Sequence, residues 1–456
     1  MNADVLVIGS GQAGVPLATR LAGAGKKVIL VERKNLGGTC VNVGCTPTKT
    51  MVASARAAHV ARTGARLGVH AGEVRIDFPA IVARKDEIVR QWRAGVEGRI
   101  QRAGERLVLV RGHARFIGAR EVEVAGERHR AQTVIVNTGA RAVVPRLEGL
   151  DTVPWLHNGT LLDVRKLPAH LVVLGGGYIG CEFAQMFRRF GAEVTVVQRG
   201  PHLLDREDPD VSEALEGVFR AEGIRVLTER KVLRAAARGS GIAISLDDGP
   251  EVEGSHLLVA AGRRPNTDDL GCDRAGIELD EKGFVRVDDQ YQTSAKGVYA
   301  VGDVTGGPQF THTSWDDHRI LYDILAGRPA RGRSGRVIPY VVFTDPQVAG
   351  VGINEREARR RGLRHEVGRM EFGSIARAIE TDETAGVLKL ILDPASERIL
   401  GANVVGVEAG ELIHVFAALM QAGATARALV DVEIAHPTFA EGLQSVAMQL
   451  PRYALR

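Results

Sequence analysis

Residues 5–14 read VLVIGSGQAG, and this stretch decides the fold of the first part of the chain. Val5 to Ile8 is a short apolar run, which predicts a buried parallel strand. Three glycines follow at the spacing Gly-x-Gly-x-x-Gly, namely Gly9, Gly11 and Gly14. The residues beyond them are largely apolar to about Ala24 and predict a helix. We therefore expect a glycine-rich turn that joins a buried strand to a helix near the N-terminus.

A second strand is predicted from Lys27 to Val31, and it ends at Glu32. An acid roughly 20 residues beyond such a glycine turn is typical of a dinucleotide site. The glycines let a pyrophosphate approach the backbone, the helix N-terminus attracts its charge, and the acid accepts hydrogen bonds from ribose hydroxyls. Glycines in an ordinary turn are the alternative for the motif alone. The strand, helix, strand and acid together favour a nucleotide.

The same pattern returns in the middle of the chain. Leu171 to Leu174 predicts a strand, the segment that ends near Phe190 a helix, and Glu193 to Val197 another strand. Gln198 follows that strand, and it is as far from Gly175 along the chain as Glu32 is from Gly9. This repeat predicts a second dinucleotide site. The residues expected to bind NAD(P) are Gly175, Gly177, Tyr178, Ile179, Gly180, Gln198 and Arg199, together with Gly262 further along the chain.

The two copies differ at the position of the acid. Gln198 stands where the first copy has Glu32, and Arg199 follows it, with Arg206 nearby. Loss of the acid removes the repulsion of a 2′-phosphate, and a guanidinium pairs well with that phosphate. The first site is therefore expected to hold an adenosine with a free 2′-hydroxyl, whereas the second favours NADPH over NADH. An exposed charge at a strand end is the alternative interpretation of Arg199.

Two of the four cysteines lie close together in residues 37–49, which read GGTCVNVGCTPTK. Cys40 and Cys45 are near enough to close a small disulfide ring. Cys45 precedes Pro47, and proline is favoured in the first turn of a helix. A thiol at a helix N-terminus is expected to have a lowered pKa and a raised reactivity, and Lys49 adds a cation one turn further on. The sequence favours a redox-active disulfide.

Two other interpretations of this cysteine pair remain. Half of a zinc site is one, but zinc takes four ligands and Cys181 and Cys272 are isolated in the sequence. Two buried apolar cysteines are the other. No metal site is predicted.

Length and composition limit the class of protein. A chain of 456 residues suggests about three domains. The net charge of +4 comes from 59 basic and 55 acidic residues, and no basic block predicts a nucleic-acid surface. No apolar run reaches the roughly 18 residues of a membrane span. The chain begins at once with a strand, and its cysteines are few, so we expect a cytosolic protein.

Periodicity and composition indicate further elements along the chain. Helices are expected over residues 51–66, 78–102, 355–361 and 408–421, and near 313. Strands are expected over residues 107–110, 114–117, 121–124, 133–136, 257–261, 297–301, 340–343 and 387–392. Residues 145–168 contain three prolines and predict a link between domains, and residues 331–335 predict a second linker.

His436 and Glu441 lie near the end of the chain in the segment HPTFAE. His436 has the alternative of a satisfied core histidine. Glu441 has the alternative of a capping box with Thr438 at the start of the last helix. The redox disulfide elsewhere in the chain is what makes an acid–base histidine necessary.

Taken together, these motifs resemble the class I pyridine nucleotide–disulfide oxidoreductases. This family includes dihydrolipoamide dehydrogenase, glutathione reductase and mercuric reductase. The motifs are residues 38–49, both glycine fingerprints, Thr138-Gly139, Gly302-Asp303 and His436-Pro437-x3-Glu441. Residues 310–317 and 338–340 are most similar to mercuric-reductase-like flavoproteins, some of which reduce reactive-chlorine or hypothiocyanite oxidants.

The resemblance implies an α/β fold with two Rossmann-like, doubly wound, three-layer domains and a C-terminal α+β dimerisation domain. The expected domains are 1–145 for FAD with the disulfide, 146–265 for NAD(P), 266–335 for the second part of the FAD domain, and 336–456 for dimerisation. The implied FAD-binding residues are Gly9, Gly11, Gly14, Glu32, Gly38, Thr39, Lys49, Ala114, Thr138, Gly139, Asp303 and Thr311.

The resemblance also implies a mechanism. Hydride passes from NADPH or NADH to FAD, and electrons then reduce the Cys40–Cys45 disulfide. Cys45 would be the flavin-proximal thiol and Cys40 the thiol that attacks substrate. His436, oriented by Glu441, would act as acid and base from the other subunit of a homodimer.

Two further residue roles come from the family. Lys49 would sit beside the flavin, paired with Glu182. Tyr178 would swing aside when nicotinamide binds. The helix expected near Thr313 would point its N–H groups at the flavin ring.

Departures from the family narrow the substrate. No cysteine pair lies near the C-terminal end of this sequence and no metal-binding module precedes the first strand, so mercuric reduction is disfavoured despite the local similarity. The Gln198-Arg199 replacement argues against an NAD-specific dihydrolipoamide dehydrogenase. Thr46, where relatives mostly have isoleucine, lies beside the disulfide. A flavin redox sensor is a third alternative, but it would not need the second nucleotide site. The expected substrate is a disulfide or another small-molecule oxidant.

Overall fold

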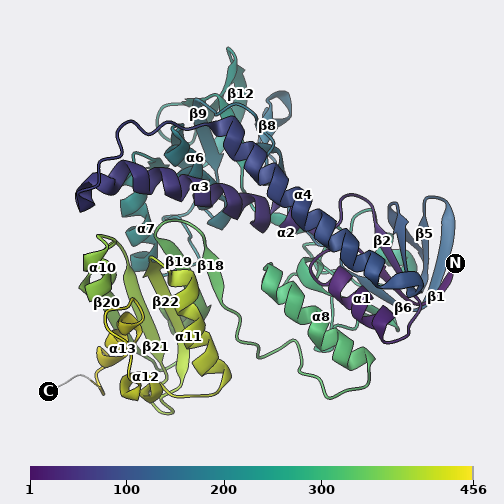
Figure 1. Ribbon diagram of the computed structural model, residues 1–456. Coiled ribbons are helices and arrows are strands. Elements are labelled where there is room, and N and C mark those ends of the chain that lie inside the picture. The colour runs from purple at the N-terminus through teal and green to yellow at the C-terminus, as the bar shows by residue number, and fades with distance from the viewer. Residues whose placement is uncertain (454–456) are drawn as a thin grey trace. The chain divides into compact units, whose positions relative to one another are not determined.

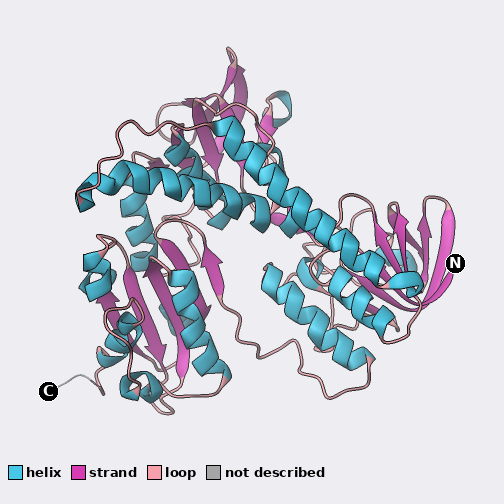
Figure 2. Cartoon of the chain, in the orientation of Figure 1, coloured by secondary structure: helices cyan, strands magenta, loops and turns pink. Residues whose placement is uncertain are grey.

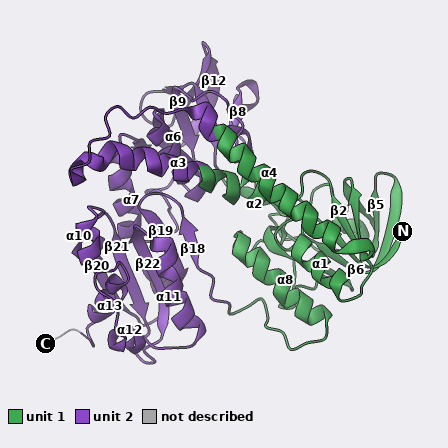
Figure 3. Cartoon of the chain, viewed as in Figure 1, with its two compact units in different colours: residues 1–50, 82–143, 262–335 green, residues 51–81, 144–261, 336–456 purple. Residues whose placement is uncertain are grey.

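The computed structural model describes residues 1–453, and this part of the chain divides into two compact units (Figure 3). The first unit contains residues 1–50, 82–143 and 262–335, and the second contains residues 51–81, 144–261 and 336–453. The expected C-terminal domain extends to residue 456, and its last three residues lie outside the described part. The division into four domain segments stays a prediction.

The first unit is built on a seven-stranded sheet in the order β3-β2-β1-β6-β5-β4, and β17 also pairs with β6 (Figure 1). Its strands are β1 (Asn2–Ile8), β2 (Val28–Glu32), β3 (Leu107–Arg111), β4 (Ala114–Gly118), β5 (Glu121–Val124), β6 (Glu127–Val136) and β17 (Val298–Ala300). A small ribbon joins β7 (Ala140–Ala142) to β16 (Arg263–Pro265). The strands β1, β2, β3, β6 and β17 are parallel, as predicted for a dinucleotide-binding fold.

Strand β1 shows why the first unit has three layers, with the sheet as the middle one. Val5 and Val7 belong to one buried cluster, and Leu6 and Ile8 to another. Successive side chains of a strand point to opposite faces, so both faces of the sheet are covered. Apolar side chains from α1 (Gly14–Gly23) and α8 (Thr311–Leu325) join the first cluster. The continuous apolar run at the N-terminus therefore becomes a central strand.

Three further helices are α2 (Gly38–Val43), α3 (Cys45–Thr63) and α4 (Phe78–Arg102). The prediction of α4 is confirmed. The helix predicted from Met51 to Arg66 starts earlier, at Cys45, because Pro47 supplies the favoured first turn. Similarly, the helix expected near Thr313 begins at Thr311.

The second unit repeats the parallel architecture with a five-stranded sheet in the order β11-β10-β9-β15-β8. Its strands are β8 (Trp155–Leu156), β9 (His170–Leu174), β10 (Glu193–Val197), β11 (Arg225–Leu227) and β15 (His256–Val259). Its helices are α5 (Asn158–Leu161), α6 (Tyr178–Phe190) and α7 (Pro209–Ala221). The predicted strand, glycine turn, helix and strand of the second copy are confirmed.

Two other sheets belong to the second unit. An antiparallel ribbon of β12 (Val232–Arg238), β13 (Gly241–Leu246) and β14 (Val252–Gly254) was absent from the sequence prediction. A five-stranded antiparallel sheet has the order β18-β19-β22-β21-β20, and Figure 2 shows helices beside it. These strands are β18 (Tyr340–Val342), β19 (Gln347–Gly352), β20 (Glu366–Glu371), β21 (Val387–Leu392) and β22 (Ile399–Gly406). The helices are α9 (Glu355–Arg360), α10 (Ala376–Glu380), α11 (Ala409–Gln421), α12 (Arg427–Asp431) and α13 (Glu441–Met448).

A buried polar stripe on α6 binds the segment between β18 and β19. Glu182 accepts a hydrogen bond from the Phe343 N–H at 2.9 Å. Arg189 pairs with Asp345 at 2.6 Å. Between them, Gln185 accepts a hydrogen bond from the Asp345 N–H at 2.8 Å. Because buried charges are stable only when paired, this stripe fixes the second fingerprint helix against the C-terminal sheet.

Among residues 1–453, no helix is long and apolar enough to cross a membrane. Within the same residues, no group of three or more His, Cys, Asp and Glu side chains is arranged to hold a metal ion.

Candidate active site

The first glycine turn is too tight for side chains. A Cβ on Gly9 would lie 2.3 Å from the Asn137 carbonyl oxygen, and Gly9 has a φ of +107°. A Cβ on Gly14 would lie 2.0 Å from the Gly9 carbonyl oxygen. A Cβ on Gly38 would lie 2.8 Å from the Gly11 Cα, so the two backbones meet. The structure thus brings Gly9, Gly11, Gly14 and Gly38 together as one backbone cradle, with Thr39 next to it in α2.

Asn137 organises this cradle, although it was not among the site residues predicted from the sequence. Its Oδ1 accepts a hydrogen bond from the Gly14 N–H at 2.9 Å, and its Nδ2 donates to the Val301 carbonyl at 2.9 Å. It is buried directly after β6. A polar residue that ends an apolar strand and precedes Thr138-Gly139 is the sequence signal that identifies it.

Glu32 is held at the end of β2. Its Oε2 accepts hydrogen bonds from the Ser10 N–H at 3.0 Å and the Ser10 hydroxyl at 2.6 Å. Its Oε1 accepts a hydrogen bond from the Lys34 N–H at 2.7 Å. The carboxylate is therefore fixed beside the glycine turn, in the position expected for a ribose-binding acid.

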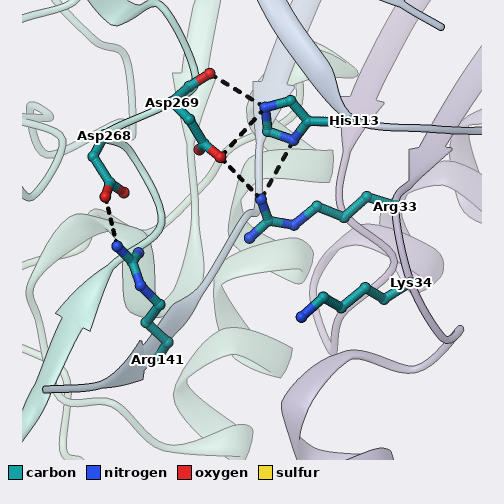
Figure 4. Close-up of a pocket in the computed structure, with 6 residues that line it drawn as sticks. All are labelled: Arg33, Lys34, His113, Arg141, Asp268 and Asp269. Atoms are coloured by element: carbon teal, nitrogen blue, oxygen red, sulfur yellow. Dashed lines mark hydrogen bonds and ion pairs between the residues drawn. The ribbon is translucent and has the colours of Figure 1, made fainter. Parts of the chain in front are cut away.

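A cavity of about 480 Å³ lies in the first unit (Figure 4). It is lined by Arg33, Lys34, His113, Arg141, Asp268 and Asp269. Figure 4 shows His113, Arg33 and Asp269 in mutual contact, and the Arg33–Asp269 ion pair is 3.4 Å long. Arg33 follows Glu32 and His113 precedes Ala114, so the cavity borders two predicted FAD residues. Its lining was not predicted from the sequence, because His113 and Asp269 lie far apart along the chain.

Three buried polar atoms near the predicted FAD residues have no hydrogen-bond partner among the described residues. They are Thr138 Oγ1, Arg263 Nε and Thr313 Oγ1. The Arg263 guanidinium also pairs with the Asp303 carboxylate at 3.0 Å. Burial raises the pKa of the Asp303 carboxyl, although the Arg263 charge opposes that rise. Buried polar atoms normally have partners, so a cluster of orphaned ones fits a bound polar ligand such as FAD.

The two cysteines lie on either side of a tight turn. Cys40 is half-buried in α2, and the exposed Cys45 begins α3. A Cβ on Gly44, between them, would lie 2.8 Å from the Thr39 carbonyl oxygen. Cys45 Sγ lies 3.3 Å from Thr311 Oγ1, at the start of α8. The thiol pair and the N-terminus of α8 therefore meet within the first unit.

The thiol of Cys40 is strongly affected by its neighbours. A hydrogen bond with Cys45 and burial both raise the pKa of Cys40, whereas the Thr311 hydroxyl and the Lys49 charge act in the opposite direction. Two thiols that share a proton ionise in sequence, so the loss of the second proton is opposed by the first charge. The lowered pKa expected of Cys45 at its helix N-terminus stays a prediction.

The second glycine turn repeats the geometry of the first. A Cβ on Gly180 would lie 1.9 Å from the Gly175 carbonyl oxygen. Gln198 Oε1 accepts a hydrogen bond from the Gly176 N–H at 3.0 Å, in the same way that Glu32 accepts one from Ser10. Gly177, Tyr178 and Ile179 lie at the start of α6, and Arg199 is exposed beyond β10.

Two predicted groupings include residues of both compact units. Gly262 belongs to the first unit, whereas the other predicted NAD(P) residues belong to the second. Lys49 is in the first unit and Glu182 in the second. These groupings stay predictions.

His436 and Glu441 are paired. His436 Nδ1 lies 2.9 Å from Glu441 Oε1, and Glu441 Oε2 accepts a hydrogen bond from the Thr438 N–H at 2.9 Å. The hydrogen bond with Glu441 raises the pKa of His436. The predicted capping box is half formed, since the Thr438 hydroxyl donates to the Ala435 carbonyl instead. His436 is exposed, so the alternative of a core histidine is wrong.

Two family profiles match this chain. A pyridine nucleotide-disulphide oxidoreductase profile matches residues 3–317, and the dimerisation domain of the same family matches residues 338–447. The chain belongs to this family. As a pyridine nucleotide-disulphide oxidoreductase, it is an enzyme that uses FAD and NAD(P)H. Its dimerisation domain supports a homodimer. The predicted fold class is confirmed.

Relatives of the oxidoreductase cover almost its entire length. A mercuric reductase of Lysinibacillus sphaericus is 34% identical and covers 98% of this chain and 82% of its own. A dihydrolipoyl dehydrogenase of Thermus scotoductus is 35% identical, with coverage of 99% and 98%. The structure of a Cu(II) complex of the HOCl-induced flavoprotein disulfide reductase RclA from Escherichia coli has a TM-score of 0.90 at 34% identity, with coverage of 98% and 99%.

Proposed function

We propose that this oxidoreductase reduces a disulfide or another small oxidant through Cys40 and Cys45, with NAD(P)H as the electron donor. The observation that carries the proposal is the contact between Cys45 Sγ and Thr311 Oγ1 at 3.3 Å. It brings the thiol pair to the N-terminus of α8, in the unit that contains the first nucleotide cradle. A redox thiol beside a dinucleotide site is what electron transfer to a disulfide requires.

FAD, when bound, supplies a carrier that accepts hydride from NAD(P)H and delivers two electrons to the disulfide. The residues that would hold it are the glycine cradle, Glu32, Thr138 and Asp303. The cavity lined by His113 would receive the adenine end, where this side chain offers a flat ring. The helix dipole of α8 would favour negative charge at Thr311.

The two thiols have different proposed roles. Cys45, at Thr311, would be the thiol next to FAD, and Cys40 would attack the substrate. With a disulfide substrate, the Cys40 thiolate breaks the sulfur–sulfur bond and forms a mixed disulfide. Cys45 then attacks Cys40, which restores the protein disulfide and releases the second substrate thiol. The substrate gains two electrons and two protons, and the thiol pair loses them.

His436 would supply the proton that the leaving thiolate needs. Glu441 holds the imidazole by its Nδ1 at 2.9 Å, which leaves Nε2 to face the substrate. We place this histidine in the active site of the partner subunit, so that each site contains residues of two chains. Tyr178 would cover the nicotinamide site until the nucleotide binds, and Lys49 would neutralise charge near the flavin with Glu182.

Variants of the two cysteines test this scheme. Cys45→Ser is expected to abolish the long-wavelength absorbance of the two-electron-reduced enzyme, because that band needs a thiolate beside the flavin. Cys40→Ser is expected to keep the band and lose disulfide reduction. Normal turnover by Cys40→Ser would overturn the proposal. Cys272→Ser, a change at a buried cysteine elsewhere in the first unit, is the matched control.

Dihydrolipoyl dehydrogenase activity is a second candidate, and the paired His436 and Glu441 favour it over mercuric reduction. A steady-state screen with NADH and NADPH separates the candidates. Its acceptors are lipoamide, glutathione disulfide, Hg(II), quinones and hypothiocyanite. Rapid reduction of lipoamide, with the reverse reaction on NAD⁺, supports the dehydrogenase. Flavin reduction by either nucleotide without turnover of any acceptor would support a redox sensor instead.

A further inference from the structure

We infer that Asp205 is a specificity residue of the second nucleotide site, and that it favours an adenosine with a free 2′-hydroxyl. The inference rests on the proposed use of that site by NAD(P)H. It opposes the preference for NADPH that Gln198 and Arg199 predict.

The comparison of the two glycine turns shows where the ribose belongs. Glu32 and Gln198 occupy equivalent positions, because each accepts a hydrogen bond from the N–H of the residue after the first glycine. The first copy has a carboxylate at this point. The second copy has a neutral amide, whose oxygen is already bound to Gly176 at 3.0 Å. The amide nitrogen therefore points to the other side of Gln198.

Asp205 lies on that other side. Its Oδ2 accepts a hydrogen bond from Gln198 Nε2 at 3.3 Å. A Cβ added to Gly200 would lie 3.0 Å from the same carboxylate oxygen, so the carboxylate also lies close to the turn after β10. Asp205 is exposed, which leaves its other oxygen accessible. The second copy thus regains a carboxylate near the ribose position, from a residue seven places after the position where the first copy has it.

The segment that contains Asp205 is held in place at both ends. Leu204 donates its N–H to the Gly176 carbonyl at 2.8 Å, within the glycine turn itself. The Arg356 guanidinium donates to the Asp205 carbonyl at 2.7 Å, and Glu216 accepts a hydrogen bond from the Leu203 N–H at 2.7 Å. Because these contacts fix the backbone, the carboxylate is positioned before a nucleotide arrives.

Charge then decides between the two nucleotides. A free 2′-hydroxyl can donate a hydrogen bond to the Asp205 carboxylate, and such charge-assisted bonds are strong. A 2′-phosphate at the same place would bring like charges together and raise the free energy of binding. Arg199 is exposed and acts in the opposite direction, by attracting the phosphate. The site therefore contains two residues with opposed effects on the choice of nucleotide: Asp205 favours NADH and Arg199 favours NADPH.

The test measures binding of two adenosine fragments to the purified FAD-loaded enzyme by isothermal titration calorimetry. Its probes are 5′-AMP and 2′,5′-ADP, which differ only in the 2′-phosphate. Asp205→Asn is expected to tighten 2′,5′-ADP relative to 5′-AMP by about tenfold, since one charge-assisted contact changes an affinity by about that factor. Arg199→Ala is expected to shift the same ratio the other way. The ratio of kcat/KM for NADPH to that for NADH should follow the binding ratio.

Glu253→Gln is the matched control, because it removes one negative charge from the ribbon strand β14 of the same unit. Equal changes in the affinity for both fragments in Asp205→Asn would overturn the inference, and they would mean that Asp205 only orients Gln198. A failure of the proposed function looks different. In that case the unaltered enzyme would bind neither fragment and NAD(P)H would not reduce its flavin.

Discussion

At the scale of single residues, the site combines groups that act on the same atoms. Thr311 contacts Cys45, and its hydrogen bond opposes the rise in the pKa of Cys40, so one hydroxyl acts on both thiols. Thr311 begins a helix, where backbone N–H groups are free to face an anion. The Thr311 hydroxyl adds a hydrogen-bond donor from the side chain. A thiolate formed here is therefore stabilised from two sources.

Thr311→Val should make the reduced thiols less reactive. The change removes the donor and keeps the side-chain shape, so the pKa of Cys40 is expected to rise. We expect alkylation by iodoacetamide at pH 7 to slow by about three- to tenfold, the range expected when one hydrogen bond is lost. Thr311→Ser should restore the rate. An unchanged dependence of alkylation on pH would show that the hydroxyl does not act on the thiols.

Glu441→Gln should shift the pH dependence of turnover. The hydrogen bond with Glu441 raises the pKa of His436 from its ordinary 6.5, so the imidazolium persists to higher pH. Without the carboxylate, His436 loses its proton at lower pH, and disulfide reduction should decline earlier on the alkaline side. We expect kcat/KM at pH 8 to fall at least about tenfold. Glu433→Gln, on the same loop, is the control, and an equal effect there would contradict the assignment.

At the scale of elements, helix α6 connects the nucleotide turn with the C-terminal sheet. Gly177 and Tyr178 lie at its start, and its buried polar stripe binds the segment between β18 and β19. The stripe was not predicted, because a helical repeat of polar residues normally indicates an exposed face. Here the partners of those polar residues come from a segment more than 150 positions away.

Gly180→Ala should remove nucleotide binding and retain FAD. The added Cβ would lie 1.9 Å from the Gly175 carbonyl oxygen, so the start of α6 must move away from the turn. We expect the flavin absorbance of the purified protein to be unchanged and the KM for NAD(P)H to rise at least about tenfold. Gly217→Ala, in α7 with open space around it, is the control. It should raise helix stability by up to about 1 kcal/mol. If Gly180→Ala and Gly217→Ala bind NAD(P)H equally well, the second glycine turn is not the nucleotide site.

Glu207 should make the stability of the second unit depend on pH. It accepts hydrogen bonds from the Tyr340 hydroxyl at 2.6 Å and from Asn403, and burial raises its pKa to about 7. The folded protein therefore holds this proton more strongly than the unfolded chain does. The stability that results is present below pH 4.5 and is lost as the pH rises towards 7.

Glu207→Gln should therefore make the stability of the protein depend less on pH. Denaturant unfolding at pH 5, 6, 7 and 8 measures it, and we expect the variant to gain up to about 3 kcal/mol relative to the unaltered protein between pH 5 and 8. An exposed acid of the same unit, Glu213→Gln, is the control. If the free energies of unfolding of Glu207→Gln and of the unaltered protein change with pH in parallel, Glu207 stays ionised in the folded protein.

At the scale of the whole molecule, the active site is expected to need two chains. The thiols belong to the first unit, whereas His436 belongs to the second, in the dimerisation domain. A homodimer can supply the histidine of one chain to the thiols of the other. This arrangement makes oligomeric assembly a condition for disulfide reduction.

Mixed dimers test that arrangement. Cys40→Ser and His436→Ala are each expected to lose disulfide reduction. If the histidine acts across the interface, a dimer with one chain of each kind has one complete site and one site that lacks both groups. Refolding a 1:1 mixture should then recover about a quarter of the unaltered activity, since half of the dimers are mixed. A mixture with no recovered activity would place both groups on one chain.

Local patterns along the chain were sufficient to predict the two glycine turns, the parallel strands around them and the cysteine pair, whereas the His436–Glu441 pair was predicted from the family resemblance. Each depends on residues close together in sequence, whose conformations follow from short-range sterics and burial. The tertiary structure alone decided how Asn137 braces the first turn, how the α6 stripe is paired, and that Asp205 returns a carboxylate to the second. The contacts of Asn137 and of the α6 stripe join segments that meet only after the sheets have formed. The loop that returns Asp205 to Gln198 is held by the Gly176 carbonyl, so no local pattern predicts that contact either.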